Sequence, residues 1–371
     1  MKFVDLDAQM KLVDSDIRQS IDRVLEHKQF IMGPEVAALE QELADYCGTG
    51  HVISAASGTD ALLMALMAYG VGPGDGIIAP PFTFVATAEV IQLLGATTVF
   101  VDVDEQTFNL DPAELERTIE KVKAEGKVNL KGIIPVDLFG LPANYDAILP
   151  MAKRYGLFVL CDAAQSFGAS YKGNKTGSIG DISATSFFPA KPLGCYGDGG
   201  AVFTNNPETA DIIESIRFHG KGATQYENVR IGLTGRMDTI QAAILSCKLK
   251  IFDQEIAQRQ HIADRYNDGL GDVVATPQTP EGSSSAWAVY TIRSSQRDAI
   301  RSALQENGIP CAVYYPSPLH RQPAFQNAIG GGGKMPVSDK LSEQVISLPV
   351  HPYLDSSDQD QVIDVIRLAV H

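Results

Sequence analysis

The sequence predicts an α/β protein with a large, mostly parallel sheet and a second, smaller α+β part. From about residue 35 to residue 204, short apolar runs alternate with segments of helical periodicity. Strands that are apolar throughout are typical of a parallel sheet covered by helices on both faces. After residue 203 this alternation ends and longer helical segments follow. A chain of 371 residues is long enough for two domains, which we expect at 1–250 and 251–371.

The first part is expected to contain strands at 51–54, 77–79, 97–101, 132–136, 157–160 and 201–204, with helices at 61–69, 83–94 and 145–155. One more helix should begin after Asp111, because Pro112 follows it and Glu114 lies three residues on, as in a capping box. Ligands of such sheets bind beyond the carboxyl ends of the strands. The functional residues should therefore lie in the loops at that edge.

Toward its end the first part is expected to contain helices at 207–217 and 237–270, the second of which continues past residue 250. The second part is expected to contain a helix at 298–307 and strands at 287–292 and 311–314. The single tryptophan, Trp287, lies in an apolar stretch and is expected in the core.

The composition excludes several classes of protein. With 30 basic and 45 acidic residues the formal charge is −15, which argues against nucleic acids and anionic membranes as partners. No apolar run approaches the length of a membrane-spanning helix. The five cysteines form no Cys-x-x-Cys pair and the seven histidines have no metal-ligand spacing. We therefore expect free thiols, no metal site and a cytoplasmic protein.

Two features at the expected strand ends could bind the phosphate and the ring of a ligand. The segment ASGTD at 56–60 follows a strand and opens a helix, so the backbone amides at Gly58 and Thr59 could hold an anion. A simple N-cap by Ser57 or Thr59 is the alternative. Phe84 follows the next strand and could stack on a planar ligand or fill the core.

Two further features carry ionisable groups. Asp162 comes at the end of the strand at 157–160, where its carboxylate either caps a helix or faces a cationic ring nitrogen. The segment SFFPAKPLGCYGDGG at 186–200 contains one cation, Lys191, five residues after Ser186. This lysine is either a surface charge or a nucleophile of lowered pKa. No helix follows the glycines at 197–200, so a tight turn with positive φ is favoured there over a phosphate loop.

Taken in order, these features supply what pyridoxal 5′-phosphate requires of a protein. The cofactor needs a phosphate cradle, a ring-stacking aromatic, an acid beside the ring nitrogen and a lysine for a Schiff base. An NAD-dependent oxidoreductase would need a G-x-G-x-x-G motif after the first strand, and SAASGTD does not supply it.

The segments TFVATA at 83–88, DAAQ at 162–165 and SFFPAK at 186–191 resemble the DegT/DnrJ family of sugar-nucleotide aminotransferases, which has the type I fold of aspartate aminotransferase. The resemblance extends from FVDL at 3–6 to YPSPLH at 315–320. It implies pyridoxal phosphate as cofactor and Lys191 and Asp162 as catalytic residues. The cofactor contacts that it implies, beyond those two, are Gly58, Thr59, Phe84, Gln165 and Ser186.

The resemblance also implies a homodimer with active sites shared between subunits. In the family, an Asn of a G-x-N-x-R motif reaches the cofactor phosphate of the other subunit, but this chain has Thr234 in that position. Arg236 matches the motif and is a candidate substrate contact. Tyr314 replaces a histidine that close relatives often have. Further substrate candidates are Arg230, Tyr315 and His320, although a surface or capping role suits His320 equally well.

The resulting prediction is transamination of a nucleotide-linked keto sugar, with L-glutamate as amino donor. The substrate expected is a UDP-2-acetamido-2-deoxy-3-keto sugar, for amino sugars of surface polysaccharide or lipopolysaccharide. A dTDP-linked 3-keto or 4-keto deoxysugar is the alternative. A non-catalytic regulator on the same fold is an alternative of a different class, and it would be expected to lack Lys191 or Asp162.

Overall fold

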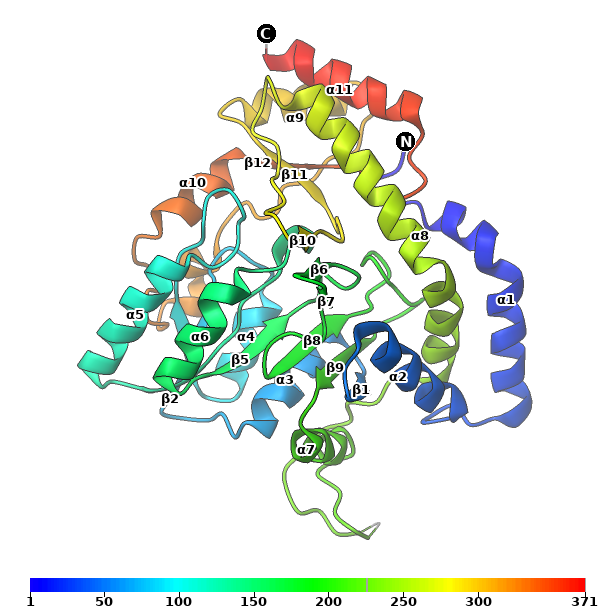
Figure 1. Ribbon diagram of the computed structural model, residues 1–371, viewed down its shortest axis with the longest axis vertical. Helices are drawn as coiled ribbons and strands as arrows, with labels where there is room; N and C mark the ends of the chain where they lie inside the picture. Colours follow the sequence, from blue (N-terminus) through cyan, green and yellow to red (C-terminus); the bar gives the residue numbers. More distant parts are fainter. Residues whose placement is uncertain (225, 371) are drawn as a thin grey trace.

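The fold is built around a seven-stranded sheet with helices on both faces (Figure 1). The computed structural model describes residues 1–224 and 226–370. The strand order is β1-β9-β8-β5-β4-β2-β3. The strands are β1 (His51–Ala55), β2 (Asp75–Ala79), β3 (Thr97–Phe100), β4 (Asn129–Ile133), β5 (Phe158–Asp162), β8 (Ile182–Ser186) and β9 (Gly200–Thr204). Neighbouring strands from β8 to β3 pair in parallel, whereas β9 pairs antiparallel with β1 and β8.

Alternate residues of the central strands enter different cores. Leu160 packs in the core that contains residues of α3, α4 and α7, and its neighbours Val159 and Cys161 pack in the core that contains residues of α5 and α6. This period of two explains why the strands are apolar throughout. The helices are α3 (Gly58–Ala68), α4 (Ala86–Leu93), α5 (Pro112–Glu125), α6 (Tyr145–Tyr155) and α7 (Pro207–Arg217).

The predicted start of α5 is confirmed. The side chain of Asp111 accepts hydrogen bonds from the backbone amides of Ala113, at 2.7 Å, and Glu114, at 3.4 Å, and Pro112 is the first helical residue. Ser57 caps α3 in the same way, by accepting from the amide of Asp60 at 3.0 Å. Both caps satisfy amides that the first turn of a helix leaves without a partner.

The C-terminal part packs around a two-stranded antiparallel sheet, β11 (Tyr290–Arg293) and β12 (Val345–Leu348). The buried apolar residues of its core lie between Ile262 and Ile366 in the sequence. It also contains α9 (Arg297–Glu306), α10 (Pro336–Gln344) and α11 (Ser356–Val370). The short strands β6 (Ser170–Tyr171), β7 (Asn174–Lys175) and β10 (Ser283–Ser284) form a separate three-stranded sheet.

Two predicted strands of this part are wrong in detail. Trp287 does not lie in a strand: its φ of 48° is left-handed, and β11 begins three residues later. The side chain is nevertheless buried in the core, as predicted. No strand forms at 311–314, where Ala312 makes an isolated bridge to Ser347. Apolar residues of this segment pack against other side chains instead of extending the sheet.

One long helix, α8 (Thr239–Leu270), runs from the central sheet into the C-terminal part, and two N-terminal helices pack on it (Figure 1). The two N-terminal helices, α1 (Leu6–His27) and α2 (Pro34–Cys47), were not among the elements expected from the sequence, and both pack on α8. The 32-residue α8 passes without a break through residue 250. The expected division at 250/251 therefore falls inside one helix, and the two-domain organisation stays a prediction.

Candidate active site

A cavity of about 550 Å³ lies at the carboxyl ends of the central strands. It brings together Gly58 and Thr59 at the start of α3, Asp162 at the end of β5, Ser186 at the end of β8, and Lys191 in the loop that follows. Other predicted site residues that line it are Phe84, Gln165, Tyr314 and Tyr315. The lining residues that were not expected from the sequence include Phe3, Thr83, Thr87, Phe188 and Asp198.

Asp162 is held by two hydrogen-bond donors. Only 4% of the residue is exposed. The hydroxyl of Thr87 donates to Oδ2 at 2.8 Å, and the amide of Ala164 donates to Oδ1 at 3.2 Å. Burial raises the pKa of Asp162, whereas these donors and the nearby Lys191 act to lower it. The result is a buried carboxylate that a cationic partner in the cavity would stabilise further.

Lys191 has the opposite shift. Burial lowers the pKa of its amine, and the charge of Asp162 opposes this effect. The backbone amide of Lys191 donates to the carbonyl of Phe188 at 2.8 Å, which fixes the turn that carries the side chain. An amine that loses its proton more readily than a surface lysine is suited to attack a carbonyl and to move protons.

The amide side chain of Gln165 joins the two parts of the fold at the cavity. Its Oε1 accepts from the amide of Phe139 at 2.8 Å, and its Nε2 donates to the hydroxyl of Tyr315 at 3.2 Å. Burial raises the pKa of Tyr315, so this phenol is neutral at ordinary pH. Tyr315 also packs edge-on against Phe82, with ring centroids 6.0 Å apart. Its position is therefore fixed from both sides.

Gly58 and Gly200 allow the backbone to close tightly at the start of α3. A Cβ added to Gly58 would lie 2.6 Å from the Cβ of Ser186, and one added to Gly200 would lie 2.5 Å from the carbonyl oxygen of Ser57. The expectation of positive φ for the glycines at 197–200 is wrong, since none of them has it. The close approach of β9 requires Gly200 instead. The hydroxyl of Ser57 donates to the carboxylate of Asp60, whereas Ser186, at the end of β8, lines the cavity and accepts from the amide of Phe188 at 3.3 Å.

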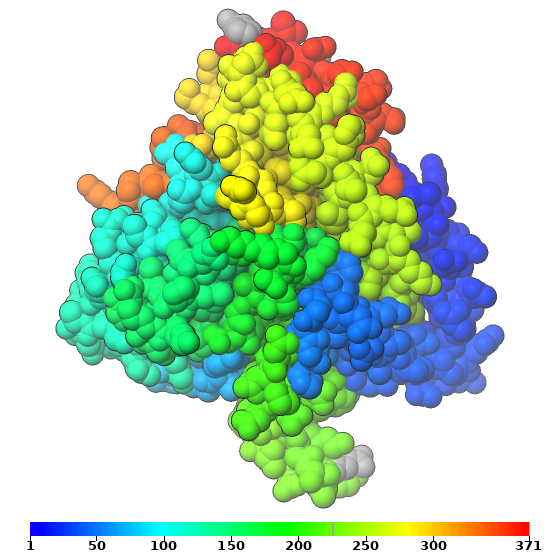
Figure 2. Space-filling view, in the orientation of Figure 1, coloured from blue at the N-terminus to red at the C-terminus, as the bar shows by residue number. Residues whose placement is uncertain are grey.

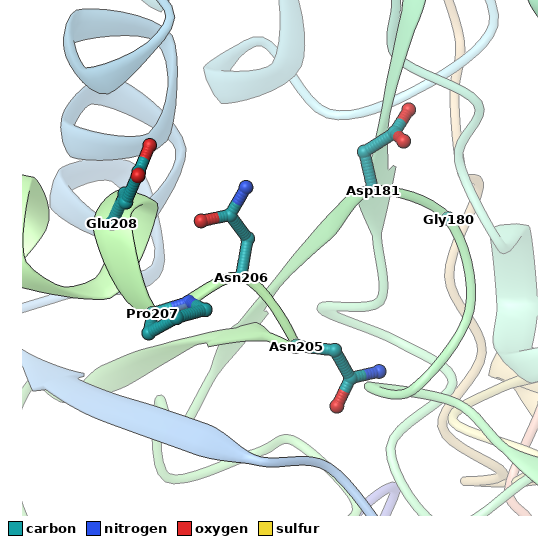
Figure 3. Close-up of a pocket in the computed structure, with 6 residues that line it drawn as sticks. All are labelled: Gly180, Asp181, Asn205, Asn206, Pro207 and Glu208. Carbon is teal, nitrogen blue, oxygen red and sulfur yellow. The ribbon is translucent and has the colours of Figure 1, made fainter.

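A second hollow of about 600 Å³ lies at the start of α7 (Figure 3). Its polar side chains already serve the fold. Asp181 accepts from the amide of Val159 at 2.8 Å, Asn205 accepts from the amide of Gly50 at 2.7 Å, and Asn206 caps α7. We therefore do not consider it a candidate site. Over residues 1–224 and 226–370 no group of three or more potential metal ligands occurs, and no helix is both long and apolar enough to cross a membrane.

Comparison with known families decides the chemistry of the cavity at the carboxyl ends of the central strands. The model of the DegT/DnrJ/EryC1/StrS aminotransferase family matches residues 11–367. The chain belongs to this family. It is a pyridoxal-phosphate-dependent aminotransferase with the type I fold, as predicted.

Three relatives illustrate the range of the family. A "UDP-2-acetamido-2-deoxy-3-oxo-D-glucuronate aminotransferase" of Pseudomonas aeruginosa is 49% identical over 96% of this chain and 97% of the relative. A "pleiotropic regulatory protein" of Geobacillus stearothermophilus is 42% identical over 98% and 96%. A "UDP-N-acetyl-3-dehydro-alpha-D-glucosamine 3-aminotransferase" of Acidithiobacillus ferrooxidans is 39% identical over 99% and 97%.

Solved structures agree with this assignment. A family member from Brucella abortus is 50% identical and superposes with a TM-score of 0.98 over 100% of this chain and 99% of that one. NtdA of Bacillus subtilis was solved with bound cofactor PMP, and it is 29% identical, with a TM-score of 0.89, over 99% of this chain and 83% of that one.

The cavity of the aminotransferase fits pyridoxal phosphate. Gly58 and Thr59 in the first turn of α3 line the cavity together with Ser186, so helix amides and a hydroxyl are available there for the cofactor phosphate. The close packing of Gly58 on Ser186 and of Gly200 on Ser57 leaves no room for larger side chains. Asp162 supplies a buried carboxylate for the ring nitrogen, and Lys191 supplies an amine of lowered pKa for the aldehyde. Phe84, 56% exposed, offers its ring to the cavity. These individual roles remain proposals.

Four predicted site residues of the aminotransferase do not line the cavity. Arg230, Thr234 and Arg236 belong to the segment between α7 and α8. Part of this segment extends away from the body of the molecule (Figure 2), and its end returns to the sheet, where the amide of Ala56 donates to the carbonyl of Gly235 at 2.9 Å. Thr234 lies 2.8 Å from Nε2 of His219, and Arg236 packs over the ring of Phe218.

The fourth of these residues is His320, whose expected substrate contact is not supported. The residue is 0% exposed, and its Nε2 lies 3.1 Å from the carboxylate of Asp339. Burial lowers the pKa of His320. The side chain serves the packing of the loop at 319–321 rather than the cavity. Local sequence does not indicate this burial, because a histidine in a loop between prolines and next to an arginine looks exposed.

Proposed function

We propose that this aminotransferase transfers the amino group of L-glutamate to the keto carbon of a UDP-2-acetamido-2-deoxy-3-keto sugar, as a step toward the amino sugars of surface polysaccharides or lipopolysaccharide. The observation that carries the proposal is the 49% identity, over nearly the whole chain, to a relative named for a UDP-linked 3-oxo sugar. The relative at 39% identity is also named for a UDP-linked 3-dehydro sugar. A dTDP-sugar transaminase of Streptomyces venezuelae is 36% identical over 98% of this chain and 95% of the relative, so the dTDP alternative has weaker support.

When bound, pyridoxal phosphate supplies an electron sink that stabilises negative charge on the carbon that loses a proton. Asp162 holds the proton on the ring nitrogen, with Thr87 and Ala164 keeping the carboxylate oriented. Lys191 removes the proton from the α-carbon of the amino donor and delivers it again at the other end of the transfer. Its lowered pKa leaves a larger fraction of the amine unprotonated than in a surface lysine, and only the unprotonated amine can accept a proton.

The dimer is part of this proposal. The segment between α7 and α8 carries Tyr226, Val229 and Ile231 as exposed apolar side chains, which is unusual for a surface loop that remains in water. We propose that a second copy of the chain covers these residues and that Thr234 and Arg236 of each copy lie at the cavity of the other. Thr234 would then contact the phosphate through a hydroxyl that is shorter than the amide common in the family.

We also propose a cytoplasmic location. The five cysteines are free, and four of them are buried in the core, where a thiol needs no partner.

The substrate proposal is tested by turnover with glutamate against matched UDP- and dTDP-linked 3-keto and 4-keto sugars. We expect 2-oxoglutarate to be released with UDP-2-acetamido-3-keto sugars. Activity with dTDP sugars alone would refute the choice of nucleotide. The Lys191→Ala protein should be inactive with every sugar and should lack the visible absorbance of the lysine-bound cofactor. If Lys191→Ala keeps wild-type turnover, the mechanism is wrong.

The relative described as a pleiotropic regulatory protein keeps one other function in view. A purely regulatory role would require no turnover from the wild-type protein, so the same assay decides it. The presence of both Lys191 and Asp162 in one cavity favours the enzyme.

A further inference from the structure

Lys248, in the first third of α8, is a buried cation outside the cavity. Its residue exposure is 0%. A lysine is almost never fully buried unless a carboxylate pairs with it. Among the described residues no carboxylate lies within ion-pair distance of Lys248. Its Nζ donates instead to the carbonyl of Gly194, at 2.7 Å, and lies 4.2 Å from the ring centroid of Tyr196.

Both partners of Lys248 belong to the loop that carries Lys191. A second residue of α8 holds the same loop: Oε1 of Gln241 accepts from the amide of Tyr196 at 2.9 Å. Gln241 and Lys248 are seven residues apart, about two helical turns, and therefore lie on one face of α8. The helix thus contacts the loop backbone at two points, one a carbonyl and the other an amide.

The turn at Lys191 is rigidly coupled to Gly194. The amide of Lys191 donates to the carbonyl of Phe188, and a Cβ added to Gly194 would lie 2.7 Å from that same carbonyl oxygen and 2.6 Å from the carbonyl oxygen of Pro189. The amide of Cys195 donates to Phe187 at 2.8 Å. No free space therefore separates Gly194 from the turn. A shift of the Gly194 carbonyl must displace the backbone that positions Lys191.

We propose that Lys248 is a positioning residue of the transamination: through the carbonyl of Gly194 it holds the loop so that the Lys191 amine faces the cavity. The inference rests on the proposed role of Lys191. A cation suits the task because a charged donor binds a carbonyl more strongly than a neutral one. The face of Tyr196 stabilises the charge that burial would otherwise disfavour.

The experiment compares Lys248→Met with Lys250→Met, a change of the same kind at an exposed position of the same helix. For Lys248→Met we expect kcat to fall by about 10- to 100-fold, as for loss of a charged hydrogen bond, with KM nearly unchanged. Lys250→Met should match the wild type. Lys248→Arg, which keeps the cation, should recover part of kcat. A kcat for Lys248→Met within about twofold of Lys250→Met would overturn the proposal.

A second experiment measures how fast the cofactor becomes attached to Lys191, independently of turnover. Each protein is mixed with pyridoxal phosphate, reduced with borohydride at timed intervals, and digested, and the cofactor attached to the Lys191 peptide is quantified by mass spectrometry. Labelling of Lys191 should be slower in Lys248→Met than in Lys250→Met. Equal labelling rates would show that Lys248 stabilises the fold without positioning Lys191, which overturns the inference.

Two controls keep the result interpretable. If the wild-type protein is never labelled at Lys191, the proposed function fails, whereas labelled wild type with unaffected Lys248→Met refutes the positioning role alone. If Lys248→Met does not yield folded protein, Gln241→Leu removes the other contact to the loop without removing a charge. It should also lower kcat at unchanged KM, and wild-type kinetics in this variant would overturn the proposal.

Discussion

Replacing Thr87 by valine tests whether its hydrogen bond to Asp162 keeps that carboxylate ionised for cofactor binding. The substitution keeps the shape of the side chain and removes the hydroxyl that donates to Oδ2 of Asp162 at 2.8 Å. The amide of Ala164, at 3.2 Å, then remains as the neutral donor to this carboxylate. The perturbation therefore acts on the ionised form of Asp162 and leaves the packing almost unchanged.

The magnitude follows from the bond that is lost. A hydrogen bond to a charged group contributes about 1.5–3 kcal/mol, which corresponds to about one to two pKa units. Burial already raises the pKa of Asp162, and the variant should raise it further. Because the cofactor ring nitrogen requires the carboxylate to be ionised, pyridoxal phosphate should bind more weakly, by up to about ten- to a hundredfold where most of the variant's Asp162 is protonated.

The assay is titration of the cofactor-free protein with pyridoxal phosphate, followed by absorbance at two pH values. The loss of affinity should be larger at the lower pH, since more of the variant's Asp162 is then protonated. Thr83→Val is the matched control, because the hydroxyl of Thr83 lies 3.3 Å from that of Thr87 and, within the described residues, does not itself hydrogen-bond to Asp162. Equal affinities for Thr87→Val and Thr83→Val would refute the reasoning.

Three further outcomes are expected. Burial raises the pKa of Asp137 to about 6, so its protonation stabilises the fold at low pH, and this contribution is lost as the pH rises through 6. Relative to Asp137→Asn, the wild type should gain about 0.8 kcal/mol in unfolding free energy when the pH falls from about 7.5 to about 5.5. Denaturant titrations measure this difference, and a difference that does not depend on pH would contradict the prediction. Gly200→Ala should lower stability by about 1–3 kcal/mol and weaken cofactor binding, because its Cβ would meet the Ser57 carbonyl, whereas Gly72→Ala, with open space around it, should do neither in melting and titration experiments. Thr234→Asn should tighten pyridoxal phosphate binding about three- to tenfold if this segment completes the partner's phosphate site, and unchanged affinity would argue against that contact.

The sequence could reveal those site residues that follow the ends of predicted strands. Asp162 follows a run of apolar residues, and Lys191 is the single cation in a loop of prolines, glycines and aromatics, so both stand out from the order of residues alone. Thr87 does not stand out, because a threonine inside a helix has no distinctive pattern. Only the packing of α4 against the end of β5 gives it a role.

The errors have physical causes as well. The apolar segment at 311–314 has the composition of a strand, but its side chains are used by tertiary packing and a single bridge satisfies Ala312. The glycines at 197–200 have the composition of a turn, although the reason for Gly200 is a neighbouring backbone that is distant in sequence. Local patterns do not contain such long-range contacts.

The continuity of α8 limits how the enzyme can move. Lys248 contacts the loop of the reactive lysine, and Arg259, further along the same helix, donates to the carbonyls of Trp287, at 3.0 Å, and Val350, at 3.4 Å, in the C-terminal part. Lys248 and Arg259 are about 16 Å apart along one unbroken helix. A hinge closure of the C-terminal part would have to bend α8 or drag the lysine loop with it. Substrate entry and product release should therefore depend on the segments at the rim of the cavity, while Lys191 and the cavity-lining Tyr314 and Tyr315 keep their positions relative to each other.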